Sequence, residues 1–155
     1  MYRVCKTFWI ETGHFLTSQK IQSDCRMPHG HSRKIEIIIS ADKLDESDMV
    51  FDFQAFKAAF GEYIDSLDHA MYINTSSPHF EYFKKNFKKT IPFENQDPTS
   101  EVIVEKMFTF FEDKLKPGTV IKNKSGFKYT ISNDIKLERV RLWETRSSWA
   151  EFSRK

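Results

Sequence analysis

Cysteine is scarce in this sequence, which contains only Cys5 and Cys25 among 155 residues. Two cysteines do not form the disulfide framework of a small secreted protein, so a reducing, cytoplasmic location is expected. A signal peptide is not expected, because the N-terminal stretch MYRVCKTFWIETGH alternates apolar with polar residues instead of clustering the apolar ones. No apolar run approaches the length of a membrane span.

The sequence also has little net charge. Lys and Arg number 24 and Asp and Glu 22, which leaves a net charge of +2 that is dispersed along the chain. This balance gives no argument for binding nucleic acid or a membrane surface. Internal repeats, low-complexity tracts and linkers are absent as well. With 15 Phe, 5 Tyr and 3 Trp for a core, residues 1–155 are expected to fold as a single domain.

The hydrophobic pattern predicts an α+β fold. Alternating aromatic and β-branched residues predict strands, and apolar residues spaced three and four apart predict helices. Because the predicted strands are grouped instead of alternating with helices, an antiparallel sheet with two helices on one face is expected. The predicted strands are 2–10, 31–41, 137–144 and, as a last edge, 149–152, with a hairpin turn at 123–126. The predicted helices are one that Asp52 caps and Phe53, Phe56, Phe60, Ile64 and Leu67 bury, a short one within 79–89, and one beginning at Asp97-Pro98.

The stretch CRMPHGHSRK concentrates one cysteine and two histidines within seven residues. On a strand, His29 and His31 point to the same face, which makes half of a metal site plausible. They could equally be two solvated histidines at the edge of a loop. His14 ends the first predicted strand, so pairing of the two strands would bring three imidazoles together. Three histidines with an open fourth position are typical of a catalytic zinc site.

Other residues suggest acid–base chemistry, each with a plainer alternative. Cys25 beside a dication would have a lowered pKa, but a lone cysteine is more often a small buried hydrophobe. Asp68 and His69 could form an acid–base pair, although sequence neighbours need not touch. Glu144 ends an alternating strand and is either an exposed edge charge or an anchor for a ligand's N–H groups.

At these residues the chain resembles the 6-pyruvoyl-tetrahydropterin synthase superfamily, and most of all its carboxy-tetrahydropterin synthase branch of queuosine biosynthesis. The resemblance covers most of the chain through motifs that run in family order. They are His14 after the first strand, CRMPHGH, DMVFDF, LDHAMYIN, DPTSE and WET. The implied fold is the tunnelling fold, in which trimers close a β-barrel from their sheets and two trimers stack into a hexamer.

The resemblance also implies the residue roles and the reaction. His14, His29 and His31 would bind zinc, Cys25 would transfer protons, and Asp68 with His69 would form a second acid–base unit. Glu144 would hold the guanidine-like edge of a pterin, with Thr99 and Glu101 lining the pocket. Active sites of the family lie between subunits, so His69 could serve a neighbour's zinc. The implied enzyme is a carbon–carbon lyase that converts 7,8-dihydroneopterin triphosphate into 6-carboxy-5,6,7,8-tetrahydropterin, acetaldehyde and triphosphate.

The choice of branch depends on one spacing, because three residues separate Cys25 from His29, as in the carboxy-tetrahydropterin synthases. The pyruvoyl synthases, which eliminate triphosphate but keep the three-carbon chain, have a longer gap and are the nearest alternative. A non-catalytic zinc- or pterin-binding module is the other. The chain departs from the pattern in two places: it has Ser47-Asp48 where many relatives have glycine, and residues 117–134 match nothing in the family pattern.

Overall fold

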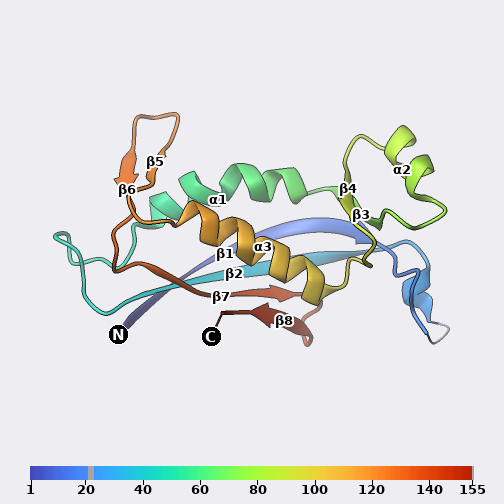
Figure 1. Ribbon diagram of the computed structural model, residues 1–155, viewed down its shortest axis with the longest axis horizontal. Coiled ribbons are helices and arrows are strands. Elements are labelled where there is room, and N and C mark those ends of the chain that lie inside the picture. The colour runs from blue at the N-terminus through green and yellow to red at the C-terminus, as the bar shows by residue number, and fades with distance from the viewer. Residues whose placement is uncertain (21–22, 155) are drawn as a thin grey trace.

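A computed structural model describes residues 1–20 and 23–154 of the chain. A curved six-stranded sheet has the strand order β4-β3-β1-β2-β7-β8, and a small hairpin pairs β5 with β6 (Figure 1). The strands are β1 (Tyr2–His14), β2 (His29–Ala41), β3 (Ala70–Asn74), β4 (Thr90–Phe93), β5 (Val120–Lys122), β6 (Lys128–Thr130), β7 (Lys136–Trp143) and β8 (Trp149–Phe152). The helices are α1 (Phe53–Leu67), α2 (Phe80–Asn86), α3 (Ser100–Lys114) and the single 3-10 turn η1 (Asp24–Arg26).

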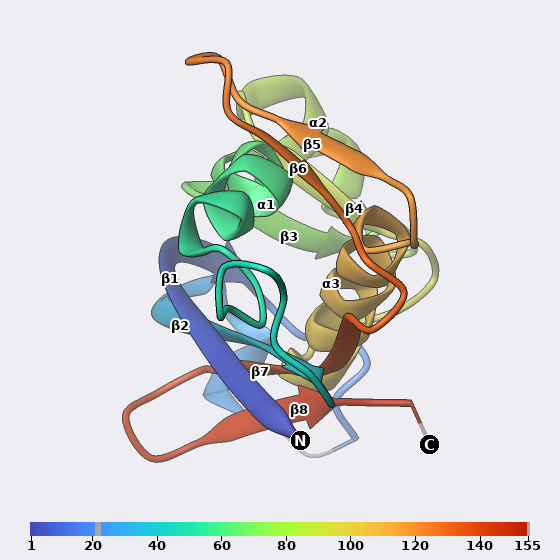
Figure 2. The same ribbon diagram turned by 90° about the vertical axis from the view of Figure 1, so that its left-hand side faces the viewer.

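Two long helices, α1 and α3, cover one face of the sheet (Figures 1 and 2), which confirms the predicted α+β arrangement. Both present the predicted aromatic stripes to the core, where the rings of Phe60 and Phe111 lie 4.6 Å apart. Asp52 caps α1 as predicted, because its side chain accepts a hydrogen bond from the amide of Gln54. The residue that caps α3 is Thr99, not Asp97 as its place before Pro98 suggested.

The long hairpin of β1 and β2 places the candidate site. Its antiparallel register pairs Tyr2 with Ala41 at one end and His14 with His29 at the other. Alternate residues of β2, such as Arg33, face the helices and are buried. Period-two geometry therefore directs the histidines of β2 to the helix-covered side, at the end of the sheet where α3 begins.

The sheet is mixed, so the prediction of an antiparallel sheet was wrong for two of its strands. β3 runs parallel to β1 and β4 runs parallel to β3. Both strands are short and follow helices, and their residues show no distinct alternation. As a result β4 and β8 form the edges of the sheet, while β1 and β7 lie inside it.

Both departures from the family pattern take a defined conformation. Asp48 has a φ angle of +60°, in the left-handed region that glycine adopts most readily, so it keeps a turn that suits glycine. Residues 120–130 form the predicted hairpin of β5 and β6, which packs Ile121 into the core beside α1. Within the described residues, no helix is long and apolar enough to cross a membrane.

Candidate metal centre and active site

Three histidines meet at the end of the β1–β2 hairpin. The ring centroids of His14 and His29 are 4.5 Å apart, those of His14 and His31 5.1 Å, and those of His29 and His31 5.0 Å. One ring nitrogen of each lies within 4.8 Å of the others, so the three could hold a metal ion. Across residues 1–20 and 23–154 this is the only such cluster of at least three histidine, cysteine or acidic side chains.

Backbone carbonyls orient two of the three rings. His14 Nδ1 lies 2.8 Å from the carbonyl oxygen of Pro98, and His29 Nδ1 lies 2.7 Å from that of Met27. A ring that donates from Nδ1 presents the lone pair of Nε2, which is the usual arrangement of a histidine that binds a metal. His31 Nε2 is buried and makes no hydrogen bond. These three nitrogens fit a metal ion.

Burial also favours the neutral form of two of the imidazoles, those of His14 and His31. It lowers the pKa of His14 to about 4, well below the usual value for histidine. Burial lowers the pKa of His31 as well, and the cation of Arg33 acts in the same direction. Neutral imidazole is the form that coordinates a metal, so the site is ready to bind one at neutral pH.

Glu144 lies at the open side of this cluster. Its Oε1 atom is 3.3 Å from His31 Nε2, 3.5 Å from His14 Nε2 and 3.2 Å from Arg33 Nη2. Partial burial raises the pKa of Glu144, but Arg33 and the two histidines outweigh it and leave the pKa below the usual value for glutamate. The carboxylate is therefore charged and faces the same space as the ring nitrogens that could hold a metal ion.

Arg33 is a site residue that the sequence prediction missed. Its side chain is fully buried two residues beyond His31, and it donates to Thr12, Ser100 and Glu144. The alternation of β2 could have revealed it, because a residue two positions after His31 must share the face of the histidines. An arginine on a buried face has to be paired, which marks it as part of a polar cluster.

The predicted acid–base pair is formed. Asp68 Oδ2 lies 2.8 Å from His69 Nδ1, and its Oδ1 accepts a hydrogen bond from the amide of Glu11 at 2.7 Å. That amide is the main reason why the pKa of Asp68 is lowered. His69 has a φ angle of +54°, which is uncommon for a residue other than glycine, and its side chain is 75% exposed.

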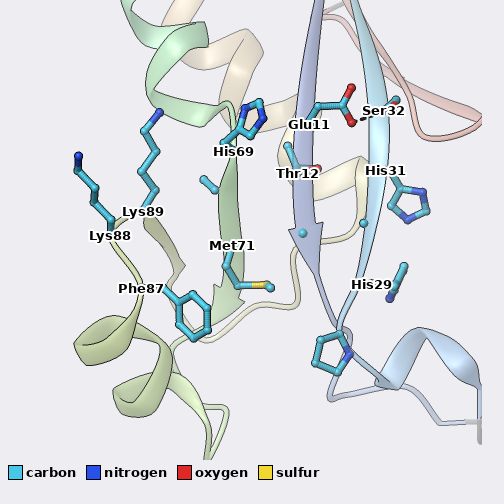
Figure 3. A pocket seen from close by; sticks show the side chains of 14 residues that line it. Glu11, Thr12, His29, His31, Ser32, His69, Met71, Phe87, Lys88 and Lys89 are labelled. Carbon is cyan, nitrogen blue, oxygen red and sulfur yellow. Dashed lines mark hydrogen bonds between the residues drawn. The ribbon is translucent and has the colours of Figure 1, made fainter.

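His69 lies in the wall of an open groove of about 810 Å³ (Figure 3). Phe87, Lys88 and Lys89 line the groove near it, and His29 and His31 contribute to another part. Figure 3 shows His69 on one side of the β1–β2 pair and the two histidines of β2 on the other. The sheet order agrees, since β1 lies between β3 and β2. In a single chain the acid–base pair therefore lies across β1 from the two histidines of β2.

The remaining predicted residues lie on two segments that flank this centre. Cys25 lies in η1, directly before β2, and its thiol is exposed. The carbonyl oxygen of Cys25 accepts from the amide of Leu16, which fixes η1 beside the end of β1. Thr99 uses its hydroxyl to cap α3, and Glu101 is exposed on the first turn of that helix.

Comparisons with known proteins identify the family and the fold. A family model described as 6-pyruvoyl tetrahydropterin synthase matches residues 3–155. A protein from Aquifex aeolicus named 6-carboxy-5,6,7,8-tetrahydropterin synthase is 28% identical over 97% of each chain. The crystal structure of an uncharacterized protein from Wolinella succinogenes has a TM-score of 0.77 and 22% identity, covering 99% of this chain and 98% of that one. The 6-pyruvoyl tetrahydropterin synthase of Caenorhabditis elegans has a TM-score of 0.64 and 18% identity, covering 99% and 96%.

Proposed function

The chain belongs to the 6-pyruvoyl tetrahydropterin synthase family and has its tunnelling fold, and we propose that it is a zinc-dependent carbon–carbon lyase. The proposed reaction converts 7,8-dihydroneopterin triphosphate and water into 6-carboxy-5,6,7,8-tetrahydropterin, acetaldehyde and triphosphate, as a step toward queuosine. Relatives named 6-carboxy-5,6,7,8-tetrahydropterin synthase support this choice within the family.

The observation that carries the proposal is the cluster of His14, His29 and His31 at one end of the hairpin. Three neutral imidazoles with an open fourth position are the donor set of catalytic zinc sites. Bound zinc would act as a Lewis acid that polarises and acidifies the hydroxyl groups of the substrate side chain. The buried Nε2 of His31, which has no hydrogen bond, supports a role toward a metal.

The other side chains are assigned to binding and proton transfer. Glu144 would accept hydrogen bonds from the guanidine-like edge of the pterin, because its charged carboxylate faces the open side of the centre. Thr99 and Glu101, at the start of α3, would line the same pocket. Cys25 and the Asp68–His69 pair would move protons as the ring is reduced and the side chain oxidised within one substrate. No external redox cofactor is needed for such an internal transfer.

We further propose that the chain, acting as a single domain, assembles in the cytoplasm into a hexamer of two trimers. The separation of His69 from His29 and His31 supports an active site between subunits, in which His69 serves a neighbour's zinc. The exposed edges at β4 and β8 supply strands that could pair with other chains. Both cysteines are free thiols, as suits a reducing compartment.

Product analysis tests the reaction. Purified, zinc-loaded protein is incubated with 7,8-dihydroneopterin triphosphate, and acetaldehyde and the pterin products are quantified. We expect acetaldehyde and 6-carboxytetrahydropterin in equal amounts. A product that keeps its three-carbon side chain would identify a pyruvoyl synthase instead, and an unchanged substrate would indicate a non-catalytic binding module.

The metal is tested separately. We expect about one zinc per chain, and His29→Ala or His31→Ala should lose most of it, because each removes one of three ligands. His79→Ala is the matched control, since His79 lies outside the cluster at the start of α2. Elemental analysis measures the content, and an active wild-type protein free of metal would refute the proposal.

A further inference from the structure

Arg33 connects four parts of the fold around the metal centre. From β2 its Nε atom donates to Thr12 Oγ1 on β1 at 3.0 Å, and its Nη1 atom donates to Ser100 Oγ at the start of α3 at 2.8 Å. Its Nη2 atom donates to Glu144 Oε1, beyond the end of β7, at 3.2 Å. The same Nη2 atom lies 3.4 Å from both ring nitrogens of His14.

A buried guanidinium beside a metal site is costly unless a nearby charge compensates it. Burial is complete for Arg33, and the three histidines of the cluster add no negative charge. Glu144 is the carboxylate that supplies this charge, and its side chain is 29% exposed. Arg33 is thus fixed in the interior, while Glu144 still faces the open side of the centre.

The planar guanidinium holds its three acceptors in one geometry, because its N–H groups point in set directions. Thr12 and Ser100 fix the plane, and the remaining donor then defines where Glu144 Oε1 lies. Without that contact the Glu144 side chain, which follows the last residue of β7, could turn toward solvent. Fixing a binding carboxylate before the ligand arrives lowers the entropy that binding has to remove.

We propose that Arg33 is a positioning residue, which holds the carboxylate of Glu144 in place to receive the edge of the pterin. This inference rests on the proposed function, in which Glu144 anchors the pterin. A merely structural Arg33 would tie β1, β2 and α3 together without changing how tightly a pterin binds. The two roles therefore differ in a measurable way.

The experiment is a double-mutant cycle on pterin binding. Neopterin, which lacks the triphosphate, serves as a fluorescent probe of binding to the zinc-loaded protein. Arg33→Met and Glu144→Gln should each raise the Kd for neopterin by about tenfold or more, the scale of a charge-assisted contact. The double variant should bind no more weakly than the weaker single variant, because both changes remove one function. Zinc content should stay unchanged in all three.

Two further variants separate positioning from folding. Arg154→Met removes another Arg–Glu pair, that with Glu112, and should leave the Kd unchanged. Arg33→Lys keeps the charge but cannot reach three acceptors at once, so its Kd should rise several-fold, less than for Arg33→Met. Arg33→Lys also provides the test if Arg33→Met folds poorly.

The outcomes distinguish this inference from the function on which it rests. A normal Kd for Glu144→Gln would show that Glu144 is not the anchor, which contradicts the proposed function. Weak binding by Glu144→Gln together with a wild-type Kd for Arg33→Met or Arg33→Lys would overturn the positioning role alone. So would losses that multiply in the double variant, since they would mean that the two residues act independently.

Discussion

In the proposed function, some side chains transfer protons and others bind the ligand. Cys25 is assigned to proton transfer. Cys25→Ala should leave zinc and pterin binding intact, while acetaldehyde release falls by about a hundredfold or more, the usual scale for a proton-transfer residue. Cys5→Ala is the control, because Cys5 is also an exposed free thiol but lies on β1 far from the histidines. Near-normal acetaldehyde release by Cys25→Ala would mean that the thiol only fills space.

Glu144 is assigned to ligand binding, so its removal should affect a different quantity. Glu144→Ala removes a charged hydrogen-bond acceptor that is used before and during the reaction, so pterin binding should weaken by about 1.5–3 kcal/mol with a smaller loss in kcat. Asp68→Asn should instead lower turnover and preserve binding, because it misorients His69 without touching the pterin. Measuring the Kd for the pterin and the acetaldehyde release on the same variants tests this assignment of roles. The assignment is wrong if both variants lose only binding or both lose only turnover.

Which of these residues the sequence could reveal depends on how local their contacts are. The alternation of β2 predicts that His29 and His31 share a face, and the strand pairing brings His14 to them. Glu144 and Ser100 reach the centre from the end of β7 and the start of α3, and the contact with Arg33 spans 111 positions in one case and 67 in the other. No local spacing encodes such contacts, so the role of Arg33 emerges only from the fold.

At the scale of elements, the segment before α3 organises the end of the sheet. Asp97 accepts hydrogen bonds from Thr17 Oγ1, the amide of Ser18 and Asn74 Nδ2, which ties the loop after β1 to β3. The next residue, Pro98, supplies the carbonyl that orients His14. The sequence predicted a helix that begins at Asp97-Pro98, with Asp97 as its cap. Its carboxylate instead joins two strand ends, because Thr99 already caps the helix.

Asp97→Asn should therefore destabilise the protein by about 1–2 kcal/mol at pH 7, a value that allows for screening by solvent. Partial burial raises the pKa of Asp97, but the three hydrogen bonds outweigh it and lower the pKa. The stabilisation is thus complete above the pKa of the unfolded state, near 4, and is lost as the pH falls below it. Urea unfolding at one protein concentration, at pH 7 and near pH 3, measures the difference.

Asp113→Asn is the control for that experiment, because Asp113 is an exposed acid that pairs with Lys116 on the surface. It should have little effect at either pH. A difference between wild type and Asp97→Asn that persists undiminished near pH 3 would show that the carboxylate charge is not what stabilises the loop.

At the scale of the whole molecule, the helix-free face of the sheet suits the inside of a barrel. Ion pairs cross this face, including Arg3 with Glu138 and Arg141 with Glu151, and Trp9 is 65% exposed on it. The edges of the sheet are β4 and β8, and β4 contains Pro92, a residue that is tolerated in edge strands.

The assembly gives the last prediction. Six chains of 18.4 kDa should give a particle of about 110 kDa by light scattering. If His69 of one chain serves the zinc of its neighbour, His31→Ala and His69→Ala hexamers should both be inactive. Mixed hexamers should then contain sites that combine an intact histidine cluster from one chain with an intact His69 from the next. In a closed ring with equal random mixing, about a quarter of the sites meet this condition.

Co-expression with two affinity tags yields such mixed hexamers, and acetaldehyde release per chain measures their activity. Recovery to about a quarter of the wild-type rate would require that the acid–base pair and the metal centre come from different chains. Mixed hexamers as inactive as their parents would mean that each chain completes its own site. In that case the separation of His69 from His29 and His31 across β1 would have to close by a movement within one chain.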